Sequence, residues 1–190
     1  GCAIGLRARI SLGRKQWLPT LINAYKGLRL IQDATNNNPD LKDALLPIGI
    51  VKYYASLNPG LIQFSLRLIG FNANREMGLE NIERAAHDGE FSSIEAKKIS
   101  AFLALWIEGD PENALIYSRD LKESFPRNYF FGIMLLESLI RTGQYTEAQI
   151  LFKKLEKDYK LLTSIQQSWY QSYYLYELAL FQFLDGNDED

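Results

Sequence analysis

Residues 109–114 read Gly-Asp-Pro-Glu-Asn-Ala, and residues 143–148 read Gly-Gln-Tyr-Thr-Glu-Ala. In each stretch a glycine is followed five residues later by an alanine, and the two copies are 34 residues apart. Apolar positions repeat with the same offset, as Leu121 and Leu155 do. Glycine supplies a positive φ in a tight turn, and the small alanine lets two helices approach closely. The spacing therefore predicts two helix-turn-helix repeats within 91–160.

The rest of the chain shows the same helical spacing of apolar residues, and no segment alternates as a strand does. Short breaks separate the predicted helices, and connections this short make neighbouring helices antiparallel. We predict an all-α chain of about ten helices, stacked as hairpins into a right-handed superhelix. The predicted helices cover 2–12, 15–36, 41–57, 60–70, 74–88, 92–108, 111–124, 127–142, 144–159 and 163–184.

The chain has 190 residues, which is enough for one domain of ordinary size, so we expect a single repeat domain over 1–190. Residues 1–90 read as degenerate repeats, because the pairing of helices slips once between residues 40 and 90. Residues 161–184 form an aromatic terminal helix, and 185–190 form an acidic tail. Both ends fall inside repeats and no initial Met is present, so we expect a fragment of a longer chain.

Six further segments carry a family resemblance: 49–54 (GIVKYY), 57–60 (LNPG), 68–71 (LIGF), 74–82 (NREMGLENI), 95–96 (EA) and 125–128 (FPRN). The 34-residue period is that of the tetratricopeptide repeat, a unit of two antiparallel helices. Together these features make the chain resemble a family of mostly uncharacterised bacterial tetratricopeptide repeat proteins, whose eukaryotic relatives are linked to clearing inclusion bodies. The resemblance implies a repeat scaffold and, for many bacterial relatives, an export signal upstream. It implies no catalytic activity.

Charge and hydropathy exclude two classes of partner. Lys and Arg total 21 and Asp and Glu total 23, so the chain lacks the excess positive charge of a nucleic-acid-binding protein. Stretches without a polar side chain, such as 130–136, are far shorter than the roughly 20 residues of a membrane-spanning helix. We expect no membrane span. The compartment stays open between the cytoplasm and a bacterial cell envelope.

Residues with catalytic or metal-binding chemistry are sparse. His87 is the single histidine and Cys2 the single cysteine, so no zinc site built from them and no nucleophile–histidine pair can form within one chain. The sequence also lacks a glycine-rich phosphate-binding motif. We therefore predict no catalytic residue, no metal site and no cofactor.

Glu137 is unusual because it lies inside an apolar predicted helix, with Arg141 one turn later. It forms either a structural ion pair or a polar contact in a binding groove. In stacked helical hairpins the first helix of each hairpin lines the concave side, which makes a groove for a peptide. The groove residues predicted in this way are Gln63, Arg67, Ile99, Leu103, Trp106, Phe130, Met134, Glu137, Arg141, Tyr173 and Tyr176. This set is largely apolar, so we expect an apolar peptide or an amphipathic helix as the guest.

Aromatic residues crowd the last predicted helix, where seven of the chain's 11 Tyr, 10 Phe and 3 Trp are found. They cover more than one face of that helix, which a helix with a single buried face does not need. Three explanations stay open: a further repeat packs on it, a homodimer forms through it, or it is a ligand surface.

Taken together, the sequence predicts a non-catalytic protein–protein interaction scaffold whose partner is a protein or a peptide. One alternative is a helical module of a larger enzyme or cell-envelope machine whose active site lies outside this segment. Another is a carrier of a small molecule or lipid. Repeat scaffolds share one fold across many unrelated roles, so the sequence does not select a biological process.

Overall fold

The computed structural model describes residues 1–57 and 72–184, and every regular element within them is helical. Nine α-helices occur in these two ranges and no β-strand, which confirms the all-α prediction. The chain divides into two compact units, Gly1–Lys97 and Lys98–Asp190, and the boundary falls inside α6 (Ser93–Leu103). The predicted helix 60–70 and the acidic tail 185–190 lie outside the described residues. The superhelix and the single repeat domain stay predictions.

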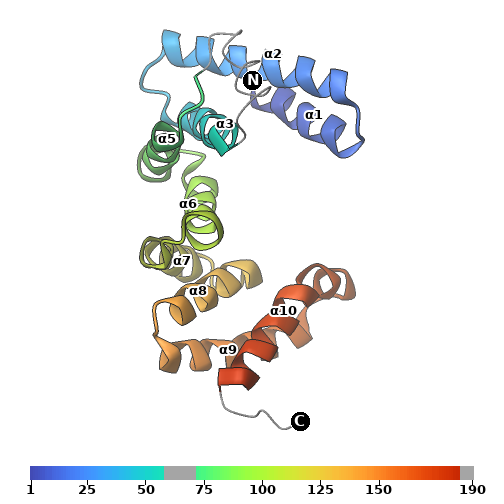
Figure 1. Cartoon of the computed structure of the whole chain (residues 1–190), viewed down its shortest axis with the longest axis vertical. Helices are drawn as coiled ribbons and strands as arrows, with labels where there is room; N and C mark the ends of the chain where they lie inside the picture. The colour runs from blue at the N-terminus through green and yellow to red at the C-terminus, as the bar shows by residue number, and fades with distance from the viewer. Residues whose placement is uncertain (58–71, 185–190) are drawn as a thin grey trace. The chain divides into compact units, whose positions relative to one another are not determined.

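The first unit contains two antiparallel helix pairs (Figure 1), α1 with α2 and α3 with α5. Their bounds are Cys2–Gly13 for α1, Trp17–Asn37 for α2, Leu45–Leu57 for α3 and Arg75–Asp88 for α5. Glycine lets the second pair approach closely, because a Cβ added to Gly78 of α5 would lie 2.7 Å from the backbone nitrogen of Tyr53 in α3. Leu28, Ile31, Ala44 and Ile48 form a hydrophobic cluster that joins α2 to α3.

A carboxylate from the segment between α2 and α3 caps the start of α6 across a long sequence separation. Asp43 lies in the short 3-10 helix η1 (Lys42–Ala44), which replaces the first turn of the helix predicted over 41–57. Its Oδ1 accepts hydrogen bonds from the backbone nitrogens of Phe91 at 2.9 Å and Ser92 at 2.7 Å, and from Ser92 Oγ at 2.7 Å. Burial raises the pKa of Asp43, but these hydrogen bonds outweigh it and hold the pKa below its ordinary value.

The second unit consists of the end of α6 and five further helical elements, in which consecutive α-helices pack antiparallel (Figure 1). These elements are η2 (Ala104–Glu108), α7 (Pro111–Ser124), α8 (Tyr129–Arg141), α9 (Tyr145–Leu161) and α10 (Ser164–Leu184). Helix α8 packs between α7 and α9, and ten of its 13 residues are buried. It supplies most of the hydrophobic core of this unit.

The turn chemistry of the two aligned stretches is confirmed. Gly109 and Gly143 have positive φ, 69° and 74°. Asp110 caps α7, since its Oδ1 accepts from the backbone nitrogen of Asn113 at 3.2 Å. Ala114 and Ala148 have no exposed surface, as close helix contacts require. One difference is that the helix predicted over 92–108 ends in a π-helix, η2, where the N–H of Gly109 donates to the carbonyl of Ala104 five residues back.

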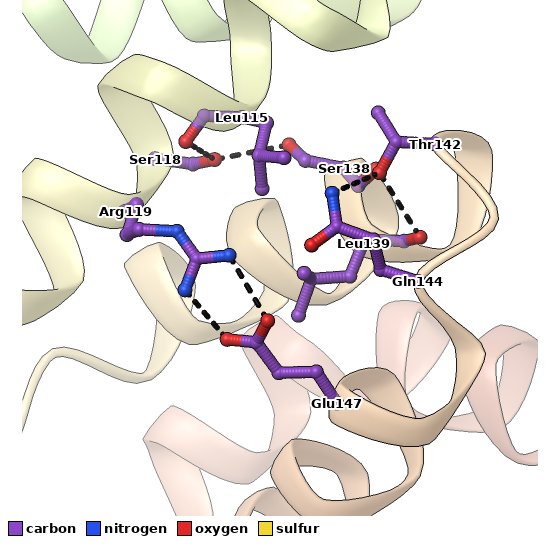
Figure 2. A network of polar contacts seen from close by, with 8 residues as sticks. All are labelled: Leu115, Ser118, Arg119, Ser138, Leu139, Thr142, Gln144 and Glu147. Atoms are coloured by element: carbon purple, nitrogen blue, oxygen red, sulfur yellow. Dashed lines mark hydrogen bonds and ion pairs between the residues drawn. The ribbon is translucent and has the colours of Figure 1, made fainter.

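Polar contacts link α7, α8 and α9 where the three helices meet (Figure 2). The buried hydroxyls of Ser118 in α7 and Ser138 in α8 lie 3.0 Å apart. On the surface, Arg119 of α7 makes a two-pronged contact with Glu147 of α9, at 2.6 and 3.0 Å. Small buried serines allow α7 and α8 to approach, and the ion pair bridges the helices on either side of α8.

Candidate functional site

An ion pair within α8 forms the polar centre of the second unit. Arg141 Nε donates to Glu137 Oε1 at 2.6 Å, and Arg141 Nη1 donates to the carbonyl of Leu105 at 2.9 Å. The Glu137 side chain is 4% exposed and that of Arg141 is 39% exposed. Leu105 lies in η2, where carbonyls of the last helical turn lack a partner within the helix. Glu137 therefore takes part in a structural ion pair, which also attaches the end of η2 to α8.

A second buried carboxyl group, Glu177 of α10, faces Glu137 of α8. Glu177 is 3% exposed, and its carboxyl lies within hydrogen-bonding reach of that of Glu137. Burial raises the pKa of Glu177, and the negative charge and the hydrogen bond of Glu137 raise it further, to about 8, against an opposing effect of Arg141. The protonated form of Glu177 is therefore favoured over a wider pH range than that of an ordinary glutamate.

Aromatic side chains of α8 and α10 line the same junction. The rings of Phe130 and Tyr173 meet edge to face, with centroids 6.0 Å apart. The negative charge of Glu137 is the main cause that raises the pKa of the Tyr176 hydroxyl, and burial and Glu177 raise it further. In η2, Trp106 packs against Phe102 with ring centroids 4.9 Å apart.

Five of the predicted groove residues meet at this junction. They are Phe130, Glu137, Arg141, Tyr173 and Tyr176. Ile99 and Trp106 are partly buried on α6 and η2. Leu103 and Met134 differ from the expectation, because both have no exposed surface and lie in the core. Helical spacing shows which residues share a face, but not which neighbour covers that face. Gln63 and Arg67 lie outside the described residues.

Glu177 is the residue that sequence reasoning missed. A signal for it was present, since it is the only charged residue in the 21 residues of α10. A lone acid in an otherwise uncharged aromatic helix indicates a buried role. Its partner on α8 is 40 residues away in sequence, and no spacing rule connects the two.

Helix α10 also carries an uncharged, exposed apolar surface next to its buried face. At 100° per residue, five exposed side chains fall within an arc of about 80° along the helix. We call them the aromatic stripe: Ile165, Trp169, Tyr173, Tyr176 and Phe183, with exposed fractions from 38% to 66%. The buried residues Glu177 and Phe181 lie on a different side of the helix.

The first unit contains an apolar pocket of about 610 Å³ between α1, α2 and α3. Its walls include the aliphatic side chains of Leu6, Leu28, Ile31, Leu46, Ile50 and Val51. Asp43 and Ser92, which form the cap of α6, also line it.

Over the described ranges, 1–57 and 72–184, no group of three or more His, Cys, Asp or Glu side chains is arranged to hold a metal ion. None of the helices in that part of the chain is long and apolar enough to cross a membrane.

Comparison with known proteins gives no match: no family model fits the chain, and neither a curated protein nor a solved structure is significantly similar to it. The tetratricopeptide repeat assignment therefore stays a prediction from the sequence.

Proposed function

We propose that this chain is a non-catalytic interaction scaffold, and that the aromatic stripe of α10 with Arg141 of α8 is its contact surface for another protein. The stripe is the observation that carries the proposal. Contiguous exposed apolar patches on soluble domains mark interaction sites, and Trp, Tyr and Arg dominate binding energies at interfaces. The stripe is uncharged and runs along a 21-residue helix, so an apolar peptide or an amphipathic helix fits it best.

Arg141 supports this choice of surface because it is held in place and its charge reaches the stripe. Its positive charge acts on the Tyr176 hydroxyl, whose pKa the nearby Glu137 raises and Arg141 lowers. Glu137 and the Leu105 carbonyl engage two of its nitrogens and fix its orientation. The exposed edge of a planar guanidinium can donate to carbonyl groups of a bound segment.

The test compares two double variants that carry the same chemical change. Trp169→Lys/Tyr176→Lys places charge on the stripe, whereas Ile116→Lys/Ile150→Lys places it on isoleucines that are 67% and 69% exposed elsewhere in the second unit. Proteins captured from the source extract are purified, and their affinity for each chain is measured by calorimetry. Both variants must first show native helicity and melting temperature.

We expect the stripe variant to lose at least tenfold in affinity and the isoleucine variant to bind like the native chain. Equal binding by both variants would contradict the proposed surface. Sedimentation velocity on the native chain covers one further outcome, since a dimer that only the stripe variant abolishes would identify a second copy as the partner. A monomeric chain that captures no protein would contradict the scaffold function itself.

The pocket of the first unit favours a second candidate function, carriage of an apolar small molecule. Its volume is in the range of ligand-binding cavities, and aliphatic side chains dominate its walls. Native mass spectrometry of chain purified without detergent tests this. A bound small molecule that a pocket-filling Val51→Phe variant loses would support carriage, and an empty native chain that binds no added fatty alcohol would contradict it.

A further inference from the structure

When both Glu137 of α8 and Glu177 of α10 are ionised, this acid pair and its surroundings carry more negative than positive charge. Glu137 Oε2 and Glu177 Oε2 are both buried, and neither has a hydrogen-bond donor in that charge state. Ionised carboxylates only accept hydrogen bonds, so two of them facing each other leave both oxygens unsatisfied. Like charges this close and this far from water do not both stay ionised.

Among the described residues, the charged groups that act on Glu177 include one cation, Arg141. On α8, Arg141 pairs with Glu137, and Tyr129 lies near enough for Glu177 to affect its pKa. On α10, the neighbour is Tyr176, and the helix contains no basic residue. From η2 comes the Leu105 carbonyl, which Arg141 engages. From α9, Tyr159 and Asp158 act on Tyr129 and add no positive charge. One guanidinium therefore serves two carboxyl groups.

We propose that a single proton held between Glu137 Oε2 and Glu177 Oε2 fastens α10 to α8, and that its release loosens the helix that carries the aromatic stripe. The proton sits on Glu177 and is donated to Glu137, which satisfies both oxygens at once. Loss of that proton leaves two buried negative charges facing each other across the α8–α10 contact. The regulatory consequence, pH control of partner binding, rests on the scaffold function proposed above.

The sign of the pH dependence follows from proton linkage. The raised pKa of Glu177, about 8 against 4.5 for an unperturbed group, means that the folded chain holds a proton which the unfolded chain has released. Stability therefore falls as pH rises from about 4.5 to about 8, by up to tenfold in the folding equilibrium constant per pH unit. Below and above this window, the contribution of the pair is constant. The two carboxyls titrate as one unit, so the midpoint belongs to the pair.

Two measurements test whether the acid pair holds this proton, and neither of them needs a binding partner. The first is carbon-13 NMR of the glutamate side-chain carboxyls of the native chain, where we expect one midpoint near 8 that is missing from Glu177→Gln. The second is urea unfolding between pH 6 and 9. We expect the native chain to lose stability with rising pH, and Glu177→Gln, which keeps a donor for Glu137 at every pH, to lose much less. Glu112→Gln, the same change at an exposed position of α7, should follow the native profile.

The regulatory step is read from hydrogen exchange in α10, corrected for intrinsic rates. Protection of α10 should fall between pH 7 and 9 in the native chain and persist in Glu177→Gln. The proposal is overturned if no carboxyl of the native chain titrates above pH 6, or if Glu177→Gln shows the native pH dependence. A titrating pair in a chain that binds no protein would contradict the scaffold function and leave the proton site standing. A chain that binds a protein partner but shows no such titration would contradict the proton site and leave the scaffold function standing.

Discussion

Helices α8 and α10 are both apolar, and each buries one glutamate, yet the protein covers them very differently. Ten of the 13 residues of α8 are buried. Among the described side chains of the 21-residue α10, only Glu177 and Phe181 reach that state. Neighbours on both sides cover α8, whereas α10 exposes the whole aromatic stripe. Apolar composition therefore indicates that a helix has faces to bury, and the packing decides which of them are buried within the chain.

The two glutamates differ for a related reason. Glu137 has Arg141 one turn later on its own helix and forms an ion pair. Glu177 has no basic residue on α10 and depends on groups of α8. A buried acid with a cation at hand can be ionised, while one without a cation keeps its proton because charge is costly away from water. The contact between α8 and α10 thus joins an acid with an ion-pair partner to an acid whose pKa is raised.

The largest expected effect is on the unfolding free energy, and it tests whether neighbouring helices cover α8 more completely than α10. Leu139→Ala removes a side chain of α8 with no exposed surface and should cost about 2–5 kcal/mol of unfolding free energy. Leu175→Ala removes a side chain of α10 that is 52% exposed and should cost no more than about 0.5 kcal/mol. Urea unfolding followed by circular dichroism measures both. Similar losses at the two positions would show that α10 is covered in solution as α8 is.

The next effect concerns the ion pair. Arg141→Ala removes the hydrogen bonds to Glu137 and to the Leu105 carbonyl, and leaves two buried acids without a cation. We expect a loss of about 1–3 kcal/mol, because an unsatisfied buried group costs its full desolvation. Arg127→Ala, an exposed arginine just before α8, is the control and should change stability by less than about 0.5 kcal/mol. Equal losses of unfolding free energy in the two variants would mean that Arg141 contributes only its positive charge, and not its contacts with Glu137 and Leu105.

Removing a helix cap should lower the unfolding free energy by less, and it also tests the difference between α8 and α10. Thr163 and Gln166 form a reciprocal cap at the start of α10: Gln166 Oε1 accepts from the Thr163 backbone nitrogen at 3.0 Å, and Thr163 Oγ1 accepts from the Gln166 backbone nitrogen at 3.3 Å. Asn128 caps α8, accepting from the Phe131 nitrogen at 3.2 Å. Replacing Thr163 or Asn128 by Ala should cost about 1 kcal/mol each.

Hydrogen exchange distinguishes the two cap variants. Thr163→Ala should speed exchange mainly within α10, which opens locally because few neighbours cover it. Asn128→Ala should lower protection across the second unit, because the buried α8 opens only with the whole unit. An identical pattern from both variants would contradict the difference in coverage.

The smallest effect is expected at the pair that bridges the helices on either side of α8. Arg119 and Glu147 are 37% and 45% exposed, and such pairs contribute about 0.2–1 kcal/mol. The hydrogen bond from Arg119 is the main cause that lowers the pKa of Glu147, so the contribution is present above pH 4.5 and is lost as pH falls through the lowered value. Arg119→Ala should remove this acid dependence, and high salt should mask the difference. A loss well above 1 kcal/mol would show that the pair is less exposed in solution.

Local sequence patterns predicted the helices well because their causes are local. The glycine turns at Gly109 and Gly143 and the cap at Asp110 each act within a few residues, and both turns are found as expected. The start of α6 was predicted to within one residue, at 92 against Ser93, but its contact with Asp43, 49 residues before Ser92, was not predicted. The π-helix η2 was also missed, since a widened last turn leaves no mark in apolar spacing.

The candidate site was predicted in part for the same reason. Glu137 and Arg141 are one turn apart, so sequence spacing reveals their contact. Met134 shares their helix but lies in the core, because coverage by neighbouring helices is not encoded in one helix.

By itself, the sequence determined that this protein is helical, the approximate bounds of the described helices, and that Glu137 and Arg141 lie one turn apart on the same helix. Each of these results depends on contacts within one or two helical turns, which a pattern can show. Only the tertiary structure decided that Glu177 meets Glu137, and which face of α10 is left as the aromatic stripe. Those features arise where two helices pack. A buried acid takes its charge state, and an apolar face its exposure, from the neighbours that the fold supplies.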